Sequence, residues 1–320
     1  MTVEPQSHHD WTVRALNIHG AIFERWTEHV FRNAAKPWTI VATQYPVEFP
    51  PPIGPSRGRE SVLDVWGEYR LGERWLSMLV ECKKNDPRFV DWVFFPAGEP
   101  EANQISMSGI QVRQHYFNPE EPDEPRDHVE VVRMVDVEDK ERPLAAITNE
   151  ARETRGKYED NKRGDFTRTS TKAIHEAAHQ VALATQAITS EQVSMTQTRL
   201  DEGQWPKSSW RRRLILPAIV TTAHLYVAEL DPAKINQESG TIEPDNVTLH
   251  RADWLWYLYP LPRHLQFSTT QAHILLEEGL SYLFTKLPIA VIRSAFLPTF
   301  LEKLPTNPSK WVLAEEQRSS

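Results

Sequence analysis

Hydrophobic positions along the chain recur with two different spacings. In residues 11–33, and again in residues 169–188, they fall three and four positions apart, which predicts two amphipathic helices. Runs rich in β-branched and apolar residues predict strands at residues 38–44, 214–222 and 225–230. A short helix is expected over residues 84–95 and a long helical region over residues 270–303. The pattern therefore predicts an α/β fold, with a mixed central sheet flanked by helices and a helical C-terminal extension.

The clearest local signal is a β-hairpin centred on Gly72 and Glu73, which can form a two-residue type II′ turn. Strand-like runs precede and follow these two residues. If they form the loop, the pairing of the strands places Asp64 directly opposite Glu81, with both side chains on one face of the sheet. Lys83 follows Glu81 by two residues and points to that face as well. The hairpin is thus expected to gather two carboxylates and a lysine at one spot.

This grouping suggests metal chemistry, because two opposed carboxylates destabilise a plain hairpin. A divalent cation removes the conflict, since hard cations such as Mg²⁺ prefer carboxylate oxygen ligands. Lys83 can then orient or help activate a water molecule for attack on a phosphodiester, while the metal stabilises the developing charge. The alternative is an ordinary hairpin that carries a surface cluster of carboxylates and a lysine.

Asp64, followed on the second strand by Glu81-Cys82-Lys83, resembles the active-site pattern of the PD-(D/E)XK superfamily of restriction-endonuclease-like nucleases. The resemblance implies that Asp64, Glu81 and the carbonyl oxygen of Cys82 hold Mg²⁺ or Mn²⁺. It further implies that Lys83 serves the attacking water. An N-terminal helix supplies another acid in some members, which makes Glu24 a candidate catalytic residue. The sequence departs from the pattern in having leucine rather than proline directly before Asp64.

The resemblance also sets expectations for domain organisation. It covers residues 12–95 well and extends more loosely to the later helix and strands. We expect a restriction-endonuclease-like core of the order αβββαβ in residues 1–230, with an insertion around residues 97–168. Residues 231–320 are expected to form a mostly helical extension packed on this core.

The function expected from these residues is metal-dependent hydrolysis of phosphodiester bonds. DNA is the favoured substrate, and the sequence leaves RNA open. Nuclease domains of this kind often serve prokaryotic defence systems, so the resemblance also implies an antiviral effector role and a sensor protein as partner. An aromatic run at residues 254–259 is either core or a contact in a homo-oligomer. A non-catalytic nucleic-acid-binding subunit that keeps only the fold is one alternative.

A second alternative comes from His175-Glu176-Ala177-Ala178-His179, which matches the HExxH pattern of zinc metallopeptidases. Histidines four residues apart share a helix face and can chelate zinc, with Glu176 as general base. Such a site needs a third ligand, and the nearest acids downstream lie in no obvious second helix. In a nuclease the same helix would let His175, His179 or Gln180 reach a phosphate. A solvated helix face is the remaining interpretation.

Basic residues near this helix and before a predicted strand are candidates for contacts with the phosphate backbone. They are Arg168, Lys172, Arg211 and Arg212. Charge runs are more often solvated faces, so these residues are also explained without nucleic acid.

Composition limits the remaining function classes. The chain has 320 residues, 36 basic and 44 acidic, with a net charge of −8, so nucleic-acid binding must come from local basic patches. Cys82 is the single cysteine and no signal peptide or membrane span is apparent, so we expect a cytoplasmic protein without membrane contact. The sequence lacks a P-loop, a Rossmann glycine pattern and a Gly-x-Ser-x-Gly elbow, which leaves NTPases, dehydrogenases and serine hydrolases without support.

Overall fold

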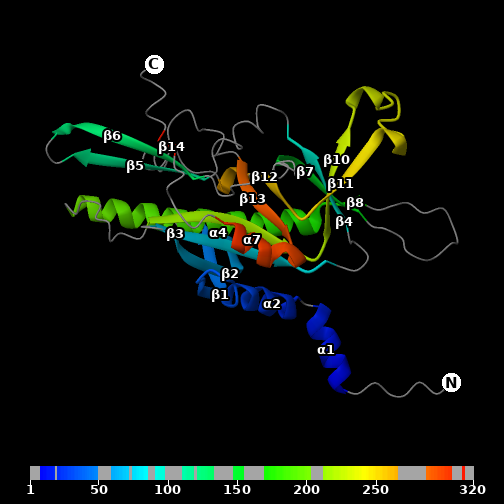
Figure 1. Ribbon diagram of the computed structural model, residues 1–320, viewed down its shortest axis with the longest axis horizontal. Coiled ribbons are helices and arrows are strands. Elements are labelled where there is room, and N and C mark those ends of the chain that lie inside the picture. Colours follow the sequence, from blue (N-terminus) through cyan, green and yellow to red (C-terminus); the bar gives the residue numbers. More distant parts are fainter. Residues whose placement is uncertain are drawn as a thin grey trace.

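A computed structural model describes residues 8–18, 20–49, 59–71, 74–85, 91–97, 110–118, 121–132, 147–154, 169–202, 212–265, 286–304 and 312–313. Within these residues the protein is mixed α/β, with a large mixed sheet and few helices (Figure 1). The α/β class predicted from the sequence is therefore confirmed.

The main sheet has eleven strands in the described part of the chain. Its order is β1 (Thr39–Phe49), β2 (Arg59–Leu71), β3 (Arg74–Lys83), β9 (Arg212–Thr221), β13 (Lys286–Arg293), β12 (Trp254–Pro260), β7 (Ile147–Thr154), β4 (Asp91–Pro96), β10 (His224–Leu230) and β11 (Val247–Ala252), with β8 (Thr169–Ser170) beside β7. A separate three-stranded sheet contains β14 (Val312–Leu313), β6 (Glu121–Val132) and β5 (Ile110–Asn118). The hairpin β2–β3 and its neighbour β1 are antiparallel, whereas β3, β9 and β13 run parallel.

Helices cover both faces of the β1–β3 end of the sheet (Figure 1). They are α2 (Ala21–Arg32), α4 (Lys172–Asp201) and α7 (Leu297–Lys303), whereas α1 (His8–Ile18) contacts α2 and projects away from the sheet. Ile174 and Val181 of α4 pack in one core cluster with Leu79, whereas α2 and α7 pack in a second cluster with Val80 and Cys82. Successive strand residues face opposite sides of a sheet, so α4 lies on one face of β3 and α2 on the other.

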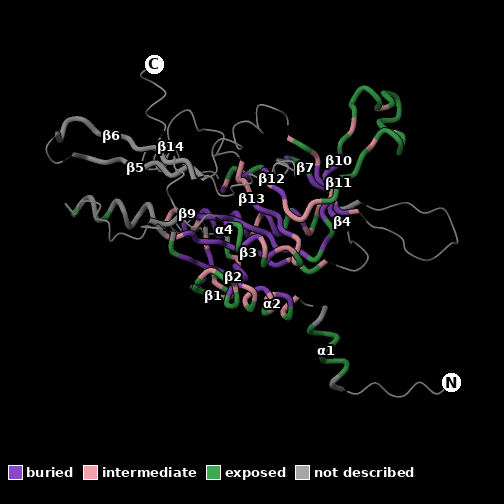
Figure 2. Tube along the Cα trace, viewed as in Figure 1, coloured by how far each residue is buried: buried purple, intermediate pink, exposed green. Residues whose placement is uncertain are grey.

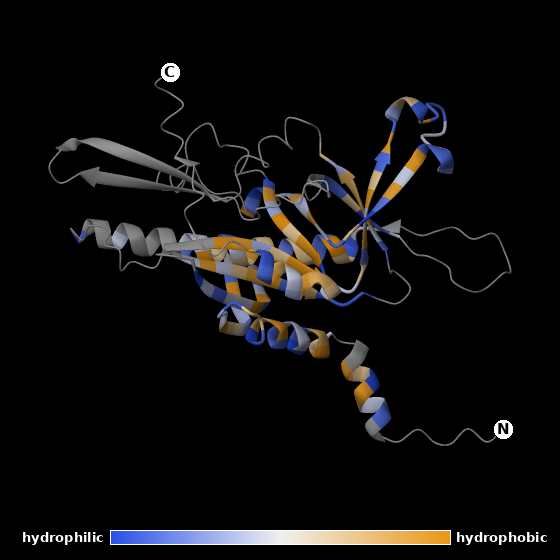
Figure 3. Cartoon of the chain, in the orientation of Figure 1, coloured by the Kyte–Doolittle hydropathy of each residue, from blue (hydrophilic) through white to orange (hydrophobic). Residues whose placement is uncertain are grey.

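Apolar side chains are concentrated in these layers. Figure 2 shows the buried positions in α4 and in the strands beside it, while α1, strand β11 and the connection between β10 and β11 are largely exposed. Figure 3 shows the same strands dominated by hydrophobic residues. The apolar stripe predicted for α4 is confirmed, since all of its members are buried: Ile174, Ala177, Val181, Ala184 and Ile188.

The predicted N-terminal helix is wrong as a single element, because it is two helices separated near Gly20. Gly20 has a φ of 78°, a left-handed conformation that ends a helix and that glycine adopts without strain. In α2, Phe23, Thr27 and Phe31 are buried at four-residue spacing. The ring of Phe31 lies against Gly67 of β2, where a Cβ atom would be only 2.7 Å from the ring. Glycine therefore allows α2 to approach the sheet closely.

Two predicted helices are strands instead. Residues 91–96 of the expected short helix form β4, between β7 and β10, and the preceding residues 86–90 lie outside the described ones. Residues 286–293 of the expected C-terminal helical region form β13, and residues 266–285 are not described. Both segments are short apolar runs buried in the sheet, and such runs lack the alternation that distinguishes strand from helix.

The mostly helical extension expected for residues 231–320 is likewise wrong for the part that the structure describes. This part contributes β11, β12 and β13 to the main sheet, and its longest helix is the seven-residue α7. Strand β7 also lies in the main sheet, although it comes from the segment 97–168 that was expected to be an insertion. Among the described helices, none has the length and hydropathy of a membrane span.

Candidate functional site

The candidate site lies where strands β2 and β3 separate. Their pairing runs from Leu71↔Arg74 to Val65↔Val80, which is the register predicted from the sequence. The turn residues 72–73 lie outside the described part of the chain. Beyond Val65, β2 continues to pair with β1, and beyond Val80, β3 continues to pair with β9. Asp64 and Glu81 thus occupy the first position past the end of the ladder, rather than a directly paired position within it.

The Asp64 carboxylate fills the gap between the separating strands. Its Oδ2 atom accepts a hydrogen bond of 2.7 Å from the backbone N–H of Cys82, in place of a carbonyl from β2. The N–H and C=O of one strand residue point to the same neighbour. The carbonyl of Cys82 therefore faces the gap too, which is the direction that a metal ligand at this point requires. The Cys82 side chain packs in the core on the α2 side, as the alternation of the strand predicts.

Glu81 is the most buried charged group of the site. Its side chain is 5% exposed, and its Oε2 atom has no hydrogen-bond partner among the described residues. Burial, and then the nearby charge of Asp64, raise the pKa of Glu81 to about 9. Burial likewise raises the pKa of Asp64 to about 6, although the hydrogen bond from the Cys82 backbone opposes the shift. The two carboxyls are therefore close enough to affect one another, in a place where neither is well solvated.

Glu24 reaches the site from helix α2 through the side chain of Gln44. The Gln44 amide Nε2 donates hydrogen bonds of 2.7 Å to Glu24 Oε2 and of 3.1 Å to Asp64 Oδ1. Burial raises the pKa of Glu24. The structure thus brings Glu24, Asp64 and Glu81 to one region. Gln44 has no sequence signal of its own, because it lies in a strand at an otherwise unremarkable position.

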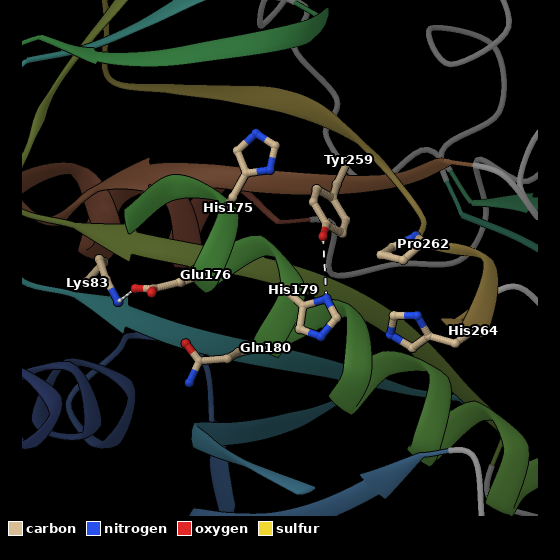
Figure 4. Close-up of a pocket in the computed structure, with 8 residues that line it drawn as sticks. All are labelled: Lys83, His175, Glu176, His179, Gln180, Tyr259, Pro262 and His264. Carbon is tan, nitrogen blue, oxygen red and sulfur yellow. Dashed lines mark hydrogen bonds and ion pairs between the residues drawn. The ribbon is translucent and has the colours of Figure 1, made fainter. Parts of the chain in front are cut away.

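Lys83 connects the acids to helix α4. Its Nζ atom is 3.8 Å from Glu176 Oε2, and its positive charge lowers the pKa of both Asp64 and Glu81. It borders a pocket of about 720 Å³ (Figure 4). The pocket is lined by Lys83, His175, Glu176, His179, Gln180, Tyr259, Pro262 and His264. The two sequence motifs that pointed to different functions therefore meet at this pocket, where Lys83 of the hairpin lies beside residues of the HEAAH helix.

The histidines of this pocket are not arranged as a zinc chelate. Figure 4 shows the rings of His175 and His179 pointing in different directions, with Tyr259 beside them. The Tyr259 hydroxyl is 3.5 Å from His179 Nδ1, and the ring of His175 lies edge-on to Tyr259 at 6.1 Å between centroids. His264, from a short 3-10 helix, has its ring 5.6 Å from that of His179. Within the described ranges, no three His, Cys, Asp or Glu side chains are grouped to hold a metal ion.

Tyr259 and His264 were not identified as site residues from the sequence. Tyr259 belongs to an aromatic run that suggested core or an oligomer contact, and its side chain is indeed buried while its hydroxyl reaches the pocket. His264 follows this run closely in the sequence, but it is not part of any recognisable motif. Only the folding of β12 against α4 brings both residues to the HEAAH helix.

The start of helix α4 is fixed by a carboxylate from the sheet. Glu153 of β7 is 5% exposed, and its Oε1 atom accepts hydrogen bonds from the backbone N–H groups of Ala173 and Ile174, at 2.6 and 3.1 Å. These N–H groups belong to the first turn of the helix, where no carbonyl within the helix can satisfy them. A buried carboxylate at this end also matches the helix dipole. Glu153 therefore sets the position from which His175 and Glu176 project.

Of the basic residues expected to contact nucleic acid, one lies near the site and another lies far from it. Lys172 is exposed at the start of α4 and lies 3.8 Å from Glu176. Arg212 pairs with Arg74, at the opposite end of the ten-residue strand β3 from Lys83. Seven residues separate Arg74 from Glu81, so Arg212 lies about 23 Å along the strand from the acids. Arg168 and Arg211 lie outside the described residues.

Comparison of the chain with protein-family models, with curated proteins and with solved structures gave no match.

The groups in the gap fit a hard divalent cation. Mg²⁺ is usually bound by one or two carboxylates and keeps several waters, so it does not need three protein side chains. Asp64 and Glu81 supply two carboxylates, and the Cys82 carbonyl faces the same gap. The buried Oε2 atom of Glu81, which accepts no hydrogen bond in the described structure, is the kind of ligand atom that a cation would satisfy. Oxygen ligands favour Mg²⁺ or Mn²⁺ over zinc.

Proposed function

We propose that the protein is a divalent-metal-dependent nuclease that hydrolyses phosphodiester bonds in DNA, with its active site in the gap between β2 and β3. The observation that carries the proposal is the burial of Asp64 and Glu81 side by side, with an unsatisfied carboxylate oxygen and with Lys83 two residues away. Burial raises the pKa of both acids, which shows that their charged forms are destabilised there. Neutral side chains would fill the same space without this destabilisation, so a purely structural role does not explain the two acids. Strongly perturbed acids beside a pocket are typical of functional sites.

The carboxylates act as ligands in this proposal, and Lys83 acts on the water. A bound Mg²⁺ would neutralise the two carboxylates and stabilise the charge that develops on the phosphodiester. Lys83 lines the pocket and is near enough to both acids to lower their pKa values, so its ammonium group can donate a hydrogen bond to the attacking water or to a phosphate oxygen. Glu176 Oε2 lies 3.8 Å from the ammonium, which is a weak ion pair because both side chains are partly exposed.

Helix α4 supplies the surface for the neighbouring phosphates. His175, His179 and Gln180 line the pocket beside Lys83, and their ring and amide N–H groups can donate to phosphate oxygens. These contacts are independent of base sequence, so they suit a substrate bound through its backbone. The zinc peptidase alternative gains no support from this geometry, because the rings of His175 and His179 point in different directions.

The order of elements supports a restriction-endonuclease-like core. Helix α2, the three antiparallel strands β1–β3, helix α4 and strand β9 follow one another along the chain, and β9 lies parallel to β3. This is the αβββαβ order that the motif resemblance implies, with further strands between β3 and α4. A role as effector of a prokaryotic defence system, with a sensor protein as partner, is the broader part of the proposal and rests on that resemblance.

Plasmid digestion tests the proposed activity. Wild-type protein is incubated with supercoiled DNA and Mg²⁺, Mn²⁺ or Zn²⁺, each with and without EDTA. We expect nicking with Mg²⁺ or Mn²⁺ that EDTA prevents and that Asp64→Asn abolishes. Asp245→Asn, in an exposed loop of the same chain, is the matched control and should cut at the wild-type rate. Equal cutting by the Asp64→Asn variant, or cutting that persists in EDTA, would contradict the proposal.

A further inference from the structure

Gln44 of strand β1 has a backbone conformation that its residue type rarely adopts. Its φ of 53° is the only positive value of a non-glycine residue in the part of the chain that the structure describes. The left-handed region disfavours residues with a Cβ atom, and such conformations persist where the surrounding structure enforces them. Such strained conformations cluster at active sites and ligand clamps.

The conformation occurs directly beside Asp64. Strand β1 pairs with β2 through Thr43↔Val65 and Tyr45↔Leu63, so Gln44 and Asp64 form the position between these two pairs. Regular pairing is thus kept on both sides of the strained residue. A left-handed residue within a paired strand turns its side chain away from the direction that the regular pleat would give it.

The redirected side chain bridges two acids from different elements. The Gln44 amide donates one hydrogen bond to Asp64 Oδ1 and one to Glu24 Oε2, which uses both hydrogens of its NH₂ group. Asp64 Oδ2 is already held by the Cys82 N–H. Both oxygens of Asp64 are therefore fixed, and Glu24 is held toward the site although it lies on helix α2.

We infer that Gln44 is a positioning residue for the metal site: its amide orients the Asp64 carboxylate and recruits Glu24 beside it. The inference rests on the proposed function, since it assigns Gln44 a role toward the cation that Asp64 and Glu81 are proposed to hold. Groups that orient metal ligands through hydrogen bonds commonly change metal affinity by about 10- to 100-fold when they are replaced. The strained backbone is maintained because it is the conformation that delivers the amide to both acids.

The test measures Mn²⁺ affinity directly, by titration of the full chain without DNA. Gln44→Met keeps the length of the side chain and removes the donor, and Gln44→Gly removes the side chain together with any backbone strain. We expect both variants to bind Mn²⁺ about 10-fold more weakly than wild type, or weaker still. Gln44→Asn, which keeps an amide and tolerates a left-handed backbone, should recover part of the loss. Gln237→Met, at an exposed loop position, is the control and should bind as wild type does.

A purely structural role would give a different pattern. In that case Gln44→Met would have lower thermal stability than wild type, but the folded protein would bind Mn²⁺ with unchanged affinity. Gln44→Gly should be at least as stable as Gln44→Met, because glycine relieves the backbone strain. If the methionine and the glycine variant both bind Mn²⁺ with wild-type affinity, the inference about Gln44 is wrong and the proposed function is unaffected. Absence of Mn²⁺ binding in the wild type would overturn the inference together with the proposed function.

Discussion

Replacing Glu81 by glutamine should stabilise the metal-free protein while abolishing its activity. Glutamine has the shape of a protonated glutamate and cannot ionise. Glu81 is 5% exposed, and burial together with the charge of Asp64 raises its pKa to about 9. The substitution therefore removes an ionisable group from a place where its charged form is disfavoured, which stabilises the metal-free protein. It also removes a carboxylate ligand that the proposed metal needs, which abolishes activity.

The size of the effect follows from the difference between the two pKa values. The carboxyl of Glu81 holds its proton more tightly in the folded protein than in the unfolded chain, where the pKa is 4.5. The free energy of unfolding therefore falls as pH rises from 4.5 to about 9. At pH 7, about 2.5 pH units above the unfolded value, the loss amounts to roughly 3 kcal/mol. Because the glutamine amide must itself be accommodated without all its hydrogen bonds, we expect a net gain of about 1–3 kcal/mol.

Urea unfolding in EDTA measures this gain, with Glu243→Gln at an exposed position as the matched control. The variant Glu81→Gln should be more stable than wild type at pH 7 and equally stable near pH 4.5. At the lower pH, Glu81 of the wild type is protonated in the folded protein and largely becomes so in the unfolded chain, so its burial no longer costs the free energy of neutralising a charge. Added Mn²⁺ should stabilise the wild type and leave Glu81→Gln unchanged, since only a ligand that binds the folded form shifts unfolding. A variant that is less stable than wild type at pH 7 without metal would refute the reasoning.

Three further predictions concern single features of the site and fold. Lys83→Ala should reduce DNA cleavage by at least ~10²-fold while Mn²⁺ affinity is kept. Lys84→Ala, at the next and exposed position, is the control and should cut at the wild-type rate. Equal cleavage by the two variants would mean that the role of Lys83 is wrongly assigned. Replacing His175 and His179 together by alanine should leave the zinc content of the purified protein unchanged, and loss of one stoichiometric zinc in elemental analysis would favour the peptidase instead. Gly67→Ala places a methyl group 2.7 Å from an aromatic ring of α2, so thermal unfolding should show a loss of about 1–3 kcal/mol, and an unchanged midpoint would contradict the packing described.

The centre of the site could be predicted from the sequence because it depends on local geometry. A two-residue turn fixes the pairing of its strands, so Gly72 and Glu73 were sufficient to bring Asp64 and Glu81 to corresponding positions. The sequence did not indicate that the strands separate at this point. That separation depends on β1 and β9, which pair with the hairpin on either side and come from other parts of the chain.

Other parts of the site depend on tertiary contacts that leave no local pattern. The left-handed backbone of Gln44 has no signal in the sequence, because glutamine is not a residue that favours such a conformation. Tyr259 and His264 reach the HEAAH helix only because β12 and the residues after it pack against α4. Hydrophobic periodicity also failed for β4 and β13, since short runs buried on both faces resemble buried helices in sequence.

The most direct test of the account is the position of the metal itself. Crystals soaked in Mn²⁺ and measured for anomalous scattering should show a peak within coordination distance of the carboxylates of Asp64 and Glu81, with the carbonyl oxygen of Cys82 beside it. The peak should be lost in crystals of Asp64→Asn. A peak among His175, His179 and His264 instead, or none in the gap between β2 and β3 at saturating Mn²⁺, would contradict the central claim.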